Sequence, residues 1–204
     1  HAIHTYYSCG NQPFEKSEYV IFLAEIASTV NEILLLKHLM KDAKGEFKKY
    51  LLSYYLDMFR TTLFRQTMFA EFEYLAHEMS EKGEPLTAEA FSNLYYKLNK
   101  QYYGKAVKHN EQIRYEWARI PHFYRSFYVY KYSTGIIAAV TIASDIIKRG
   151  EAAFAGYKKF LSAGNSTGPI EILKYAGVDL TDKKPFETAM AEFKATLKEL
   201  ESLA

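Results

Sequence analysis

The sequence predicts an all-α protein. Apolar residues recur at helical spacing along nearly the whole chain. No stretch shows sustained alternation of apolar and polar residues between turn signals, as a strand would. Hydrophobic residues make up 49% of the 204 residues, enough for a substantial core in one domain or one large part of a domain.

Turn signals divide the chain into the expected helices. The first of these is a short segment that has the character of a helix end. The run Cys9-Gly10-Asn11-Gln12-Pro13 breaks that first helix, Gly45 separates the next two, and Lys82-Gly83-Glu84-Pro85 closes the third. Thr87 caps the fourth helix, and a loop over 104–110 follows it. The helices expected from the amino terminus onward cover residues 1–8, 17–41, 46–82 and 87–103.

The second half of the chain begins with the motif-rich segment 117–135, which leads into an apolar helix ending near Gly150. A helix over 151–162 comes next, and then one over 170–176 that Gly177 ends. Pro185 in a first helical turn starts the last helix. We therefore expect a multi-helix architecture without internal repeats.

Charge and hydropathy exclude several classes of function. The net charge is +2, with 26 basic and 24 acidic residues intermixed, so we expect no nucleic-acid partner. The apolar stretches 19–36 and 133–147 contain charged residues, so we expect no membrane span. A start of His-Ala-Ile-His does not resemble a signal peptide, and the lone Cys9 suits a reducing compartment. These features predict a cytoplasmic protein.

Aromatic residues are unusually frequent, at 16% of the chain, and 18 of them are tyrosines. Tyrosine combines a packing ring with a hydroxyl that needs a partner. Two interpretations remain open at this point. The rings belong to a helical core with many half-buried aromatics, or they line a groove for an extended ligand.

Two candidate groups of metal-binding side chains lie near the amino terminus. His1 and His4 are three residues apart and share a helix face, a spacing compatible with ligation but common by chance. Glu25 stands among apolar residues and is expected to be partly buried, so its charge needs a cation, a hydrogen-bond network or a metal. Glu32 lies two helical turns further on and is expected to support the same site.

A third candidate is the tyrosine-rich segment 120–135, which contains His122. If it is helical, Tyr124, Tyr128 and Tyr132 repeat every four positions and share a face, whereas Tyr130 points elsewhere. A stripe of hydroxyls is unusual in a dry core because each buried hydroxyl needs a partner. Aromatic packing remains the alternative to a binding role.

These segments, in this order, resemble the oligoendopeptidase F branch of the thimet oligopeptidase-like zinc metallopeptidases. The run His1-Ala2-Ile3-His4-Thr5-Tyr6-Tyr7-Ser8 is similar to the family pattern H-E-x-G-H-A-x-H from its second metal histidine onward. Residues 24–29 resemble the stretch with the family's glutamate ligand, and residues 121–124 with the following tyrosines resemble its substrate segment. Ala176-Gly177-Val178-Asp179 resembles the family's C-terminal end.

The resemblance implies a zincin-like oligopeptidase, of which residues 1–204 would form the C-terminal portion of the catalytic domain. It implies zinc bound by His1 and Glu25, and a zinc-activated water that attacks an internal bond of a short peptide. It also implies that His122 and Tyr128, Tyr130 or Tyr132 contact substrate or the oxyanion, without settling which tyrosine acts. Helix geometry favours Tyr128 and Tyr132 as the catalytic donors, with Tyr124 and Tyr130 binding substrate. His4 would have a supporting or structural role.

The resemblance also implies that two parts of the machinery precede His1: the first metal histidine and the catalytic glutamate. We therefore expect the peptidase activity to belong to the longer parent protein, and residues 1–204 alone to be inactive. Apolar surface left uncovered would favour self-association. The alternative is a non-catalytic helical domain that binds peptides or a protein partner through its tyrosine-rich face.

Overall fold

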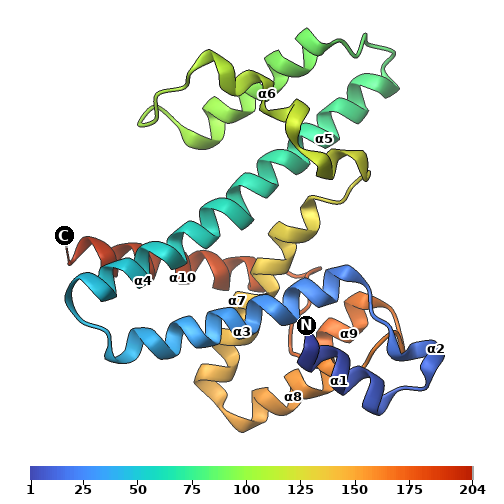
Figure 1. The fold of residues 1–204 in the computed structure, drawn as a ribbon, viewed down its shortest axis with the longest axis vertical. Helices are drawn as coiled ribbons and strands as arrows, with labels where there is room; N and C mark the ends of the chain where they lie inside the picture. The colour runs from blue at the N-terminus through green and yellow to red at the C-terminus, as the bar shows by residue number, and fades with distance from the viewer. Residues whose placement is uncertain (204) are drawn as a thin grey trace. The chain divides into compact units, whose positions relative to one another are not determined.

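The computed structural model describes residues 1–203, and within them it contains helices and no strand, so the predicted all-α class is confirmed (Figure 1). The chain divides into two compact units. Unit 1 comprises residues 1–59 together with the chain from residue 134 onward, and unit 2 comprises residues 60–133.

Unit 1 is built from helices at both ends of the chain. They are α1 (Ala2–Asn11), α2 (Phe14–Ser17), α3 (Ile21–Asp42), α4 (Gly45–Met58), the part of α7 (Tyr130–Arg149) from residue 134, α8 (Glu151–Leu161), α9 (Pro169–Tyr175) and α10 (Lys184–Glu201). Helix α4 packs against both α3 and α10, and α8 packs against α1 and α9 (Figure 1).

The core of unit 1 follows from the helical spacing of apolar residues in α3. Leu23, Ile26, Val30 and Ile33 recur at intervals of three and four residues, and each is at most 1% exposed. Burial of each such side chain stabilises the fold by about 1.5–3 kcal/mol. The stripe fixes which face of α3 is turned inward.

A close backbone contact secures the amino-terminal helices of unit 1. The amide of Asn165 donates to the carbonyl of Lys16 at 2.7 Å, and Gly164 has a φ of 52°. A Cβ added at Gly164 would lie 2.1 Å from that same carbonyl oxygen. The position therefore needs glycine both for its left-handed backbone and for its lack of a side chain.

Unit 2 contains a pair of packed helices and two 3-10 segments. Its elements are the remainder of the π-helix η1 (Phe59–Phe64), α5 (Arg65–Glu81), α6 (Ala88–Tyr103), η2 (Glu111–Arg119), η3 (Pro121–Tyr124) and the first turn of α7, residues 130–133. The Thr87 hydroxyl accepts from the Ala90 amide at 3.1 Å, which confirms the predicted cap of α6. Helix α6 packs against α5 and η2.

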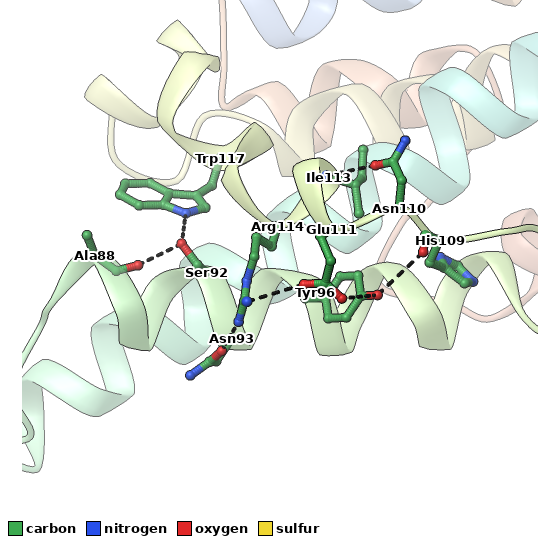
Figure 2. Close-up of polar contacts among 10 residues, drawn as sticks. All are labelled: Ala88, Ser92, Asn93, Tyr96, His109, Asn110, Glu111, Ile113, Arg114 and Trp117. Carbon is green, nitrogen blue, oxygen red and sulfur yellow. Dashed lines mark hydrogen bonds and ion pairs between the residues drawn. The ribbon is translucent and has the colours of Figure 1, made fainter.

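The core of unit 2 is largely aromatic. Its buried cluster consists of Met68, Phe69, Phe72, Tyr95, Leu98, Ile120 and Val129. Polar contacts dock η2 onto α6 beside this cluster (Figure 2). The indole N–H of Trp117 donates to the Ser92 hydroxyl at 3.1 Å, and Tyr96 donates to Glu111 at 3.2 Å.

Several predicted helix bounds are wrong, for local reasons. The first helix continues through Gly10 to Asn11, whose side chain donates to the Tyr7 carbonyl at 2.7 Å. The helix expected over 17–41 begins only at Ile21, after the separate turn α2. The helix expected over 46–82 contains the π-helical stretch η1. Within residues 1–203, no helix has the length and apolar character needed to cross a bilayer.

Candidate functional site

Three of the predicted site residues come together in unit 2: His122, Tyr128 and Tyr132. The ring centroid of His122 lies 5.8 Å from that of each tyrosine, and the two tyrosine centroids are 5.6 Å apart. The Tyr132 hydroxyl donates to the Tyr128 hydroxyl at 3.3 Å. His122 is exposed to solvent and both tyrosines are half-buried. Because the Tyr132 hydroxyl donates to Tyr128, the cluster offers the His122 imidazole and the Tyr128 hydroxyl as hydrogen-bond donors to a ligand. We call these three residues the His122–Tyr128–Tyr132 cluster.

The segment carrying this cluster is not one helix, so the predicted shared face of three tyrosines is wrong. The chain leaves η3 after Tyr124, passes through an irregular stretch, and enters α7 at Tyr130, which is 44% exposed. Tyr128 and Tyr132 still meet because Tyr128 immediately precedes the first turn of α7. Tyr124 is 88% exposed and lines a different pocket.

A strained residue shapes the irregular stretch. Phe127 has a φ of 53°, and among residues 1–203 no other non-glycine residue has a positive φ. The Phe127 amide donates to the Glu73 carboxylate at 2.6 Å, and its ring stacks on His77 with centroids 4.7 Å apart. Glu73 and His77 are one turn apart on α5, so this helix holds the loop that leads into the cluster. Sequence reasoning missed this pair.

Two cations lie close to the cluster. The guanidinium carbon of Arg125 is 5.8 Å and the Lys131 ammonium is 5.2 Å from the ring centroid of Tyr128. Positive charge at these distances favours anionic ligands or negative charge that develops during a reaction. The cluster therefore lies beside two positively charged side chains.

Glu25 lies in α3 of unit 1 and is half-buried, as predicted, with buried Ala24 and Ile26 on either side. Within residues 1–203, neither an ion pair nor a hydrogen bond engages its carboxylate. The salt bridge that was the alternative to a ligand role is therefore absent from the described chain. The half-buried Glu25 carboxylate is therefore available to bind a cation.

Glu32 does not join Glu25. It is exposed and accepts a hydrogen bond of 2.7 Å from the Tyr54 hydroxyl of α4. This carboxylate raises the pKa of Tyr54, first through the hydrogen bond and then through its charge. The expectation that Glu32 supports the Glu25 site is wrong, because α4 engages it instead.

The two amino-terminal histidines have different environments. His1 is exposed and precedes α1, whereas His4 is only 2% exposed. The His4 ring stacks on Tyr19 at 3.6 Å between centroids, and its Nδ1 is buried without a hydrogen-bond partner. Burial, and then the positive amino terminus, lower the pKa of His4 to about 4. His4 is thus a neutral packing residue, and His1 is the more accessible donor.

The donor chemistry available in unit 1 fits zinc only in part. An exposed imidazole at His1 and an unpaired carboxylate at Glu25 are both ligand types that zinc takes. Within residues 1–203, no three histidine, cysteine, aspartate or glutamate side chains form a group able to hold a metal. A complete tetrahedral site would need a further protein ligand and a water.

Comparison with known proteins gives consistent matches across the chain. The model of Peptidase family M3 matches residues 1–192. The oligopeptidase PepF of Bacillus subtilis is 48% identical over 204 residues, which are 100% of this chain and 30% of that protein. The group B oligopeptidase PepB of Streptococcus agalactiae is 44% identical, again over 100% of this chain and 34% of the relative.

A solved structure agrees with these matches. The crystal structure of oligoendopeptidase-F from Enterococcus faecium superimposes with a TM-score of 0.88 at 46% identity, over 100% of this chain and 37% of the other. The chain thus spans about a third of the length of the proteins it matches. Together the family model and the relatives define a class of peptidases that contain this helical fold. The chain belongs to that class, Peptidase family M3.

Proposed function

We propose that the protein is a zinc-dependent metalloendopeptidase that hydrolyses internal bonds of short peptides, and that residues 1–204 form the C-terminal portion of its catalytic domain. The observation that carries the proposal is the His122–Tyr128–Tyr132 cluster, with its centroids within 5.8 Å of one another and two cations beside it. The membership in Peptidase family M3 supports the same activity.

In this proposal the donors of unit 2 bind the substrate and the charge that forms on it. The His122 imidazole and the Tyr128 hydroxyl would donate hydrogen bonds to the oxyanion of the scissile carbonyl, and the Tyr132 hydroxyl, which donates its single proton to Tyr128, would hold and polarise that donor. Such donors act best when they are held in place before the reaction, because no reorganisation is then needed. The Tyr128–Tyr132 hydrogen bond and the Glu73 contact with the Phe127 amide supply that restraint. Tyr124 and Tyr130 would contact the peptide on either side.

Zinc would be held by His1 and Glu25 with one further protein ligand, and it would supply a Lewis acid and an activated water. The unpaired state of the Glu25 carboxylate supports this role. By the family pattern, the further histidine and the general base would belong to the protein sequence before His1. We therefore expect residues 1–204 alone to show no chelator-sensitive cleavage.

Substitution of the two tyrosines tests the proposed donor role. In the full-length enzyme, Tyr128→Phe and Tyr132→Phe each remove a hydroxyl and keep the ring. Loss of one oxyanion donor is expected to reduce kcat about 10²–10³-fold. Cleavage of a quenched fluorescent peptide measures the effect, and the larger of the two losses identifies the principal donor.

Tyr74→Phe is a matched control, since Tyr74 is 60% exposed on α5 and is expected to leave kcat unchanged. If both cluster variants retain wild-type kcat, the cluster is aromatic packing and the proposed mechanism is wrong. If full-length wild type shows no turnover that a chelator abolishes, the chain is better described as a non-catalytic domain that binds peptides through its tyrosine-rich face.

The remaining features of the proposal concern partners and location. Short peptides are the proposed substrates, with neither nucleic acid nor membrane as a partner, and the cytoplasm is the proposed compartment. Self-association remains a prediction for residues 1–204 in isolation. Exposed apolar side chains on α3 and α4 support it, namely Leu35, Leu39, Phe47 and Tyr50, which are 41–62% exposed.

A further inference from the structure

Unit 2 contains a second concave feature, which we call the aromatic pocket. It has a volume of about 240 Å³ and lies among residues of α5, α6, η2 and η3. Its apolar lining is formed by Phe72, Phe91, Trp117, Ile120, Phe123 and Tyr124. Pockets for drug-sized ligands span about 300–1,000 Å³, so this one suits a single side chain better than a whole small molecule.

The walls of the aromatic pocket are fixed by contacts among themselves. The ring of Phe72 lies 5.9 Å from Phe91 and 5.3 Å from Phe123 between centroids. Phe91 and Trp117 meet edge to face at 5.2 Å. Phe72 is 5% exposed and belongs to the buried core of unit 2, so the floor of the pocket is part of the fold. The pocket is therefore formed before any ligand arrives.

Trp117 is held by a polar contact on the side of α6. Its indole N–H donates to the Ser92 hydroxyl at 3.1 Å, and that hydroxyl donates to the Ala88 carbonyl at 2.7 Å (Figure 2). Ser92 is 2% exposed, so this chain of hydrogen bonds is protected from water. Because the indole N–H is already hydrogen-bonded, Trp117 needs no polar partner on a ligand. The pocket that it lines can therefore remain apolar.

The aromatic pocket adjoins the segment proposed to bind substrate. The short helix η3 supplies Phe123 and Tyr124 to the pocket and His122 to the donor cluster. Glu73 and His77 also line the pocket, and they hold the backbone and ring of Phe127 in the loop that follows. The short helix η3 and the loop that follows it therefore border both the aromatic pocket and the donor cluster.

We propose that the aromatic pocket binds one apolar side chain of the peptide substrate, with a preference for an aromatic ring. This inference rests on the proposed peptidase function. Ring edges and faces in the walls suit an aromatic guest, which gains stabilisation from ring pairs beyond that of its buried area. The buried carboxylate of Glu73 at the pocket disfavours an acidic side chain, because like charges repel in a site of low dielectric. The pocket would thus determine which peptides are cleaved efficiently.

The test compares peptides that differ at one residue. Quenched fluorescent peptides carrying Phe, Ala or Asp at each position around the cleaved bond are assayed with the full-length enzyme. At one position we expect kcat/KM to fall in the order Phe, Ala, Asp. Ala76→Phe and Ala118→Phe each fill the pocket from a different wall. In both variants the ratio of kcat/KM for the Phe peptide to that for the Ala peptide is expected to fall at least about tenfold.

Ala118 is exposed, so Ala118→Phe is tolerated by the fold even if Ala76→Phe is not. Ala155→Phe, at an exposed position on α8 in unit 1, makes the same change outside the pocket and should leave the ratio unaltered. An unaltered ratio in the Ala118→Phe enzyme, or a wild type indifferent to Phe, Ala and Asp at every position, overturns the proposal.

Binding without catalysis separates this inference from the proposed function. Trp117 is the single tryptophan of residues 1–204, and the part of the full-length protein's fluorescence that is lost in Trp117→Phe reports on the pocket. In zinc-free protein, the Phe peptide is expected to change that fluorescence, and Ala118→Phe to abolish the change. A fluorescence change without any cleavage by zinc-loaded enzyme would refute the peptidase and keep the pocket. Cleavage without any effect of the peptide on Trp117 would refute the pocket and keep the peptidase.

Discussion

Two buried carboxylates of unit 2 differ from the half-buried Glu25 of unit 1 in their partners. In unit 2, Glu116 is 8% exposed and accepts from Arg65 at 2.7 Å, from Tyr95 at 2.5 Å and from Arg119. Glu73, at 7% exposed, accepts from the Phe127 amide. In unit 1, the half-buried Glu25 has no such partner within residues 1–203. Removal of one partner from a buried carboxylate is costly, whereas a half-buried carboxylate without a protein partner stays available to a ligand.

The same contrast extends to neutral polar groups. Tyr95 of unit 2 and Tyr55 of unit 1 are both 0% exposed. The Tyr95 hydroxyl donates to Glu116, but the Tyr55 hydroxyl and the Nδ1 of His4 are buried without partners. In unit 2 the Nε of Arg114 is also unpaired, although its guanidinium otherwise contacts Asn93 and Glu111. Among residues 1–203, unit 1 thus contains two buried side-chain polar atoms without a partner and unit 2 contains one.

Removal of the Glu116 carboxylate gives the largest expected effect on stability. Glu116→Ala leaves the buried Tyr95 hydroxyl without an acceptor and separates Arg65 from its ion pair. We expect a loss of about 2–3 kcal/mol in the free energy of unfolding. This is at the lower end of the losses found when a buried ion pair is broken, because both arginines remain partly solvated. Denaturant unfolding, with hydrogen exchange of α6 amides to localise the loss, measures it. A loss below about 0.5 kcal/mol, the range of ordinary surface substitutions, would contradict a structural role for Glu116.

The second prediction concerns the pH dependence of unit 1. His4 has a pKa of about 4 in the fold and about 6.5 when unfolded, so the folded state requires the neutral ring. The stability contributed by neutral His4 is fully present above pH ~6.5 and is lost as the pH falls towards 4. Between pH 7 and 5 the wild type is expected to lose about 2 kcal/mol from this group. His4→Phe keeps an aromatic ring against Tyr19 and should remove most of that loss. Identical pH profiles for the two proteins would refute this account of His4.

The smallest effects are expected from a matched pair of Tyr→Phe substitutions. Tyr55→Phe removes an unpartnered buried hydroxyl and should raise the free energy of unfolding by about 1 kcal/mol. Tyr95→Phe removes a donor to Glu116 and should lower it by about 1–2 kcal/mol. Thermal or denaturant unfolding of both variants measures the difference in sign. If both variants lose the same free energy of unfolding, the proposed difference between the Tyr55 and Tyr95 hydroxyls is wrong.

The sequence was sufficient for the fold class and for most helix positions. Helical periodicity, the Thr87 cap and the glycine at 177 predict elements that depend on neighbouring residues, and these agree with the structure. The partial burial of Glu25 also followed from its apolar neighbours. Local sequence is informative wherever the deciding interactions lie within a turn or two of the helix.

The predictions were wrong where contacts between residues far apart in the sequence determine the backbone conformation. Periodicity predicted one helix through Tyr124, Tyr128 and Tyr132, but Glu73 binds the Phe127 amide from 54 residues away and holds a positive φ there. No local pattern encodes that contact. The i, i+4 spacing of Glu73 and His77 was the available signal, and only the structure connects it with Phe127. The role of Glu32 was missed in the same way, because Tyr54 on α4 engages it.

The most direct test of the central claim is the zinc content of the full-length Glu25→Gln protein. We predict that peptide cleavage is lost and that zinc affinity falls by more than about 100-fold. Substitution of residues that only support a metal ligand typically lowers metal affinity about 10–100-fold. The free energy of unfolding of the zinc-free protein should change by less than about 1 kcal/mol, since no internal partner of Glu25 is removed. Elemental analysis, a quenched fluorescent peptide assay and denaturant unfolding give the three readouts. A Glu25→Gln protein that is fully loaded with zinc and active would contradict the account.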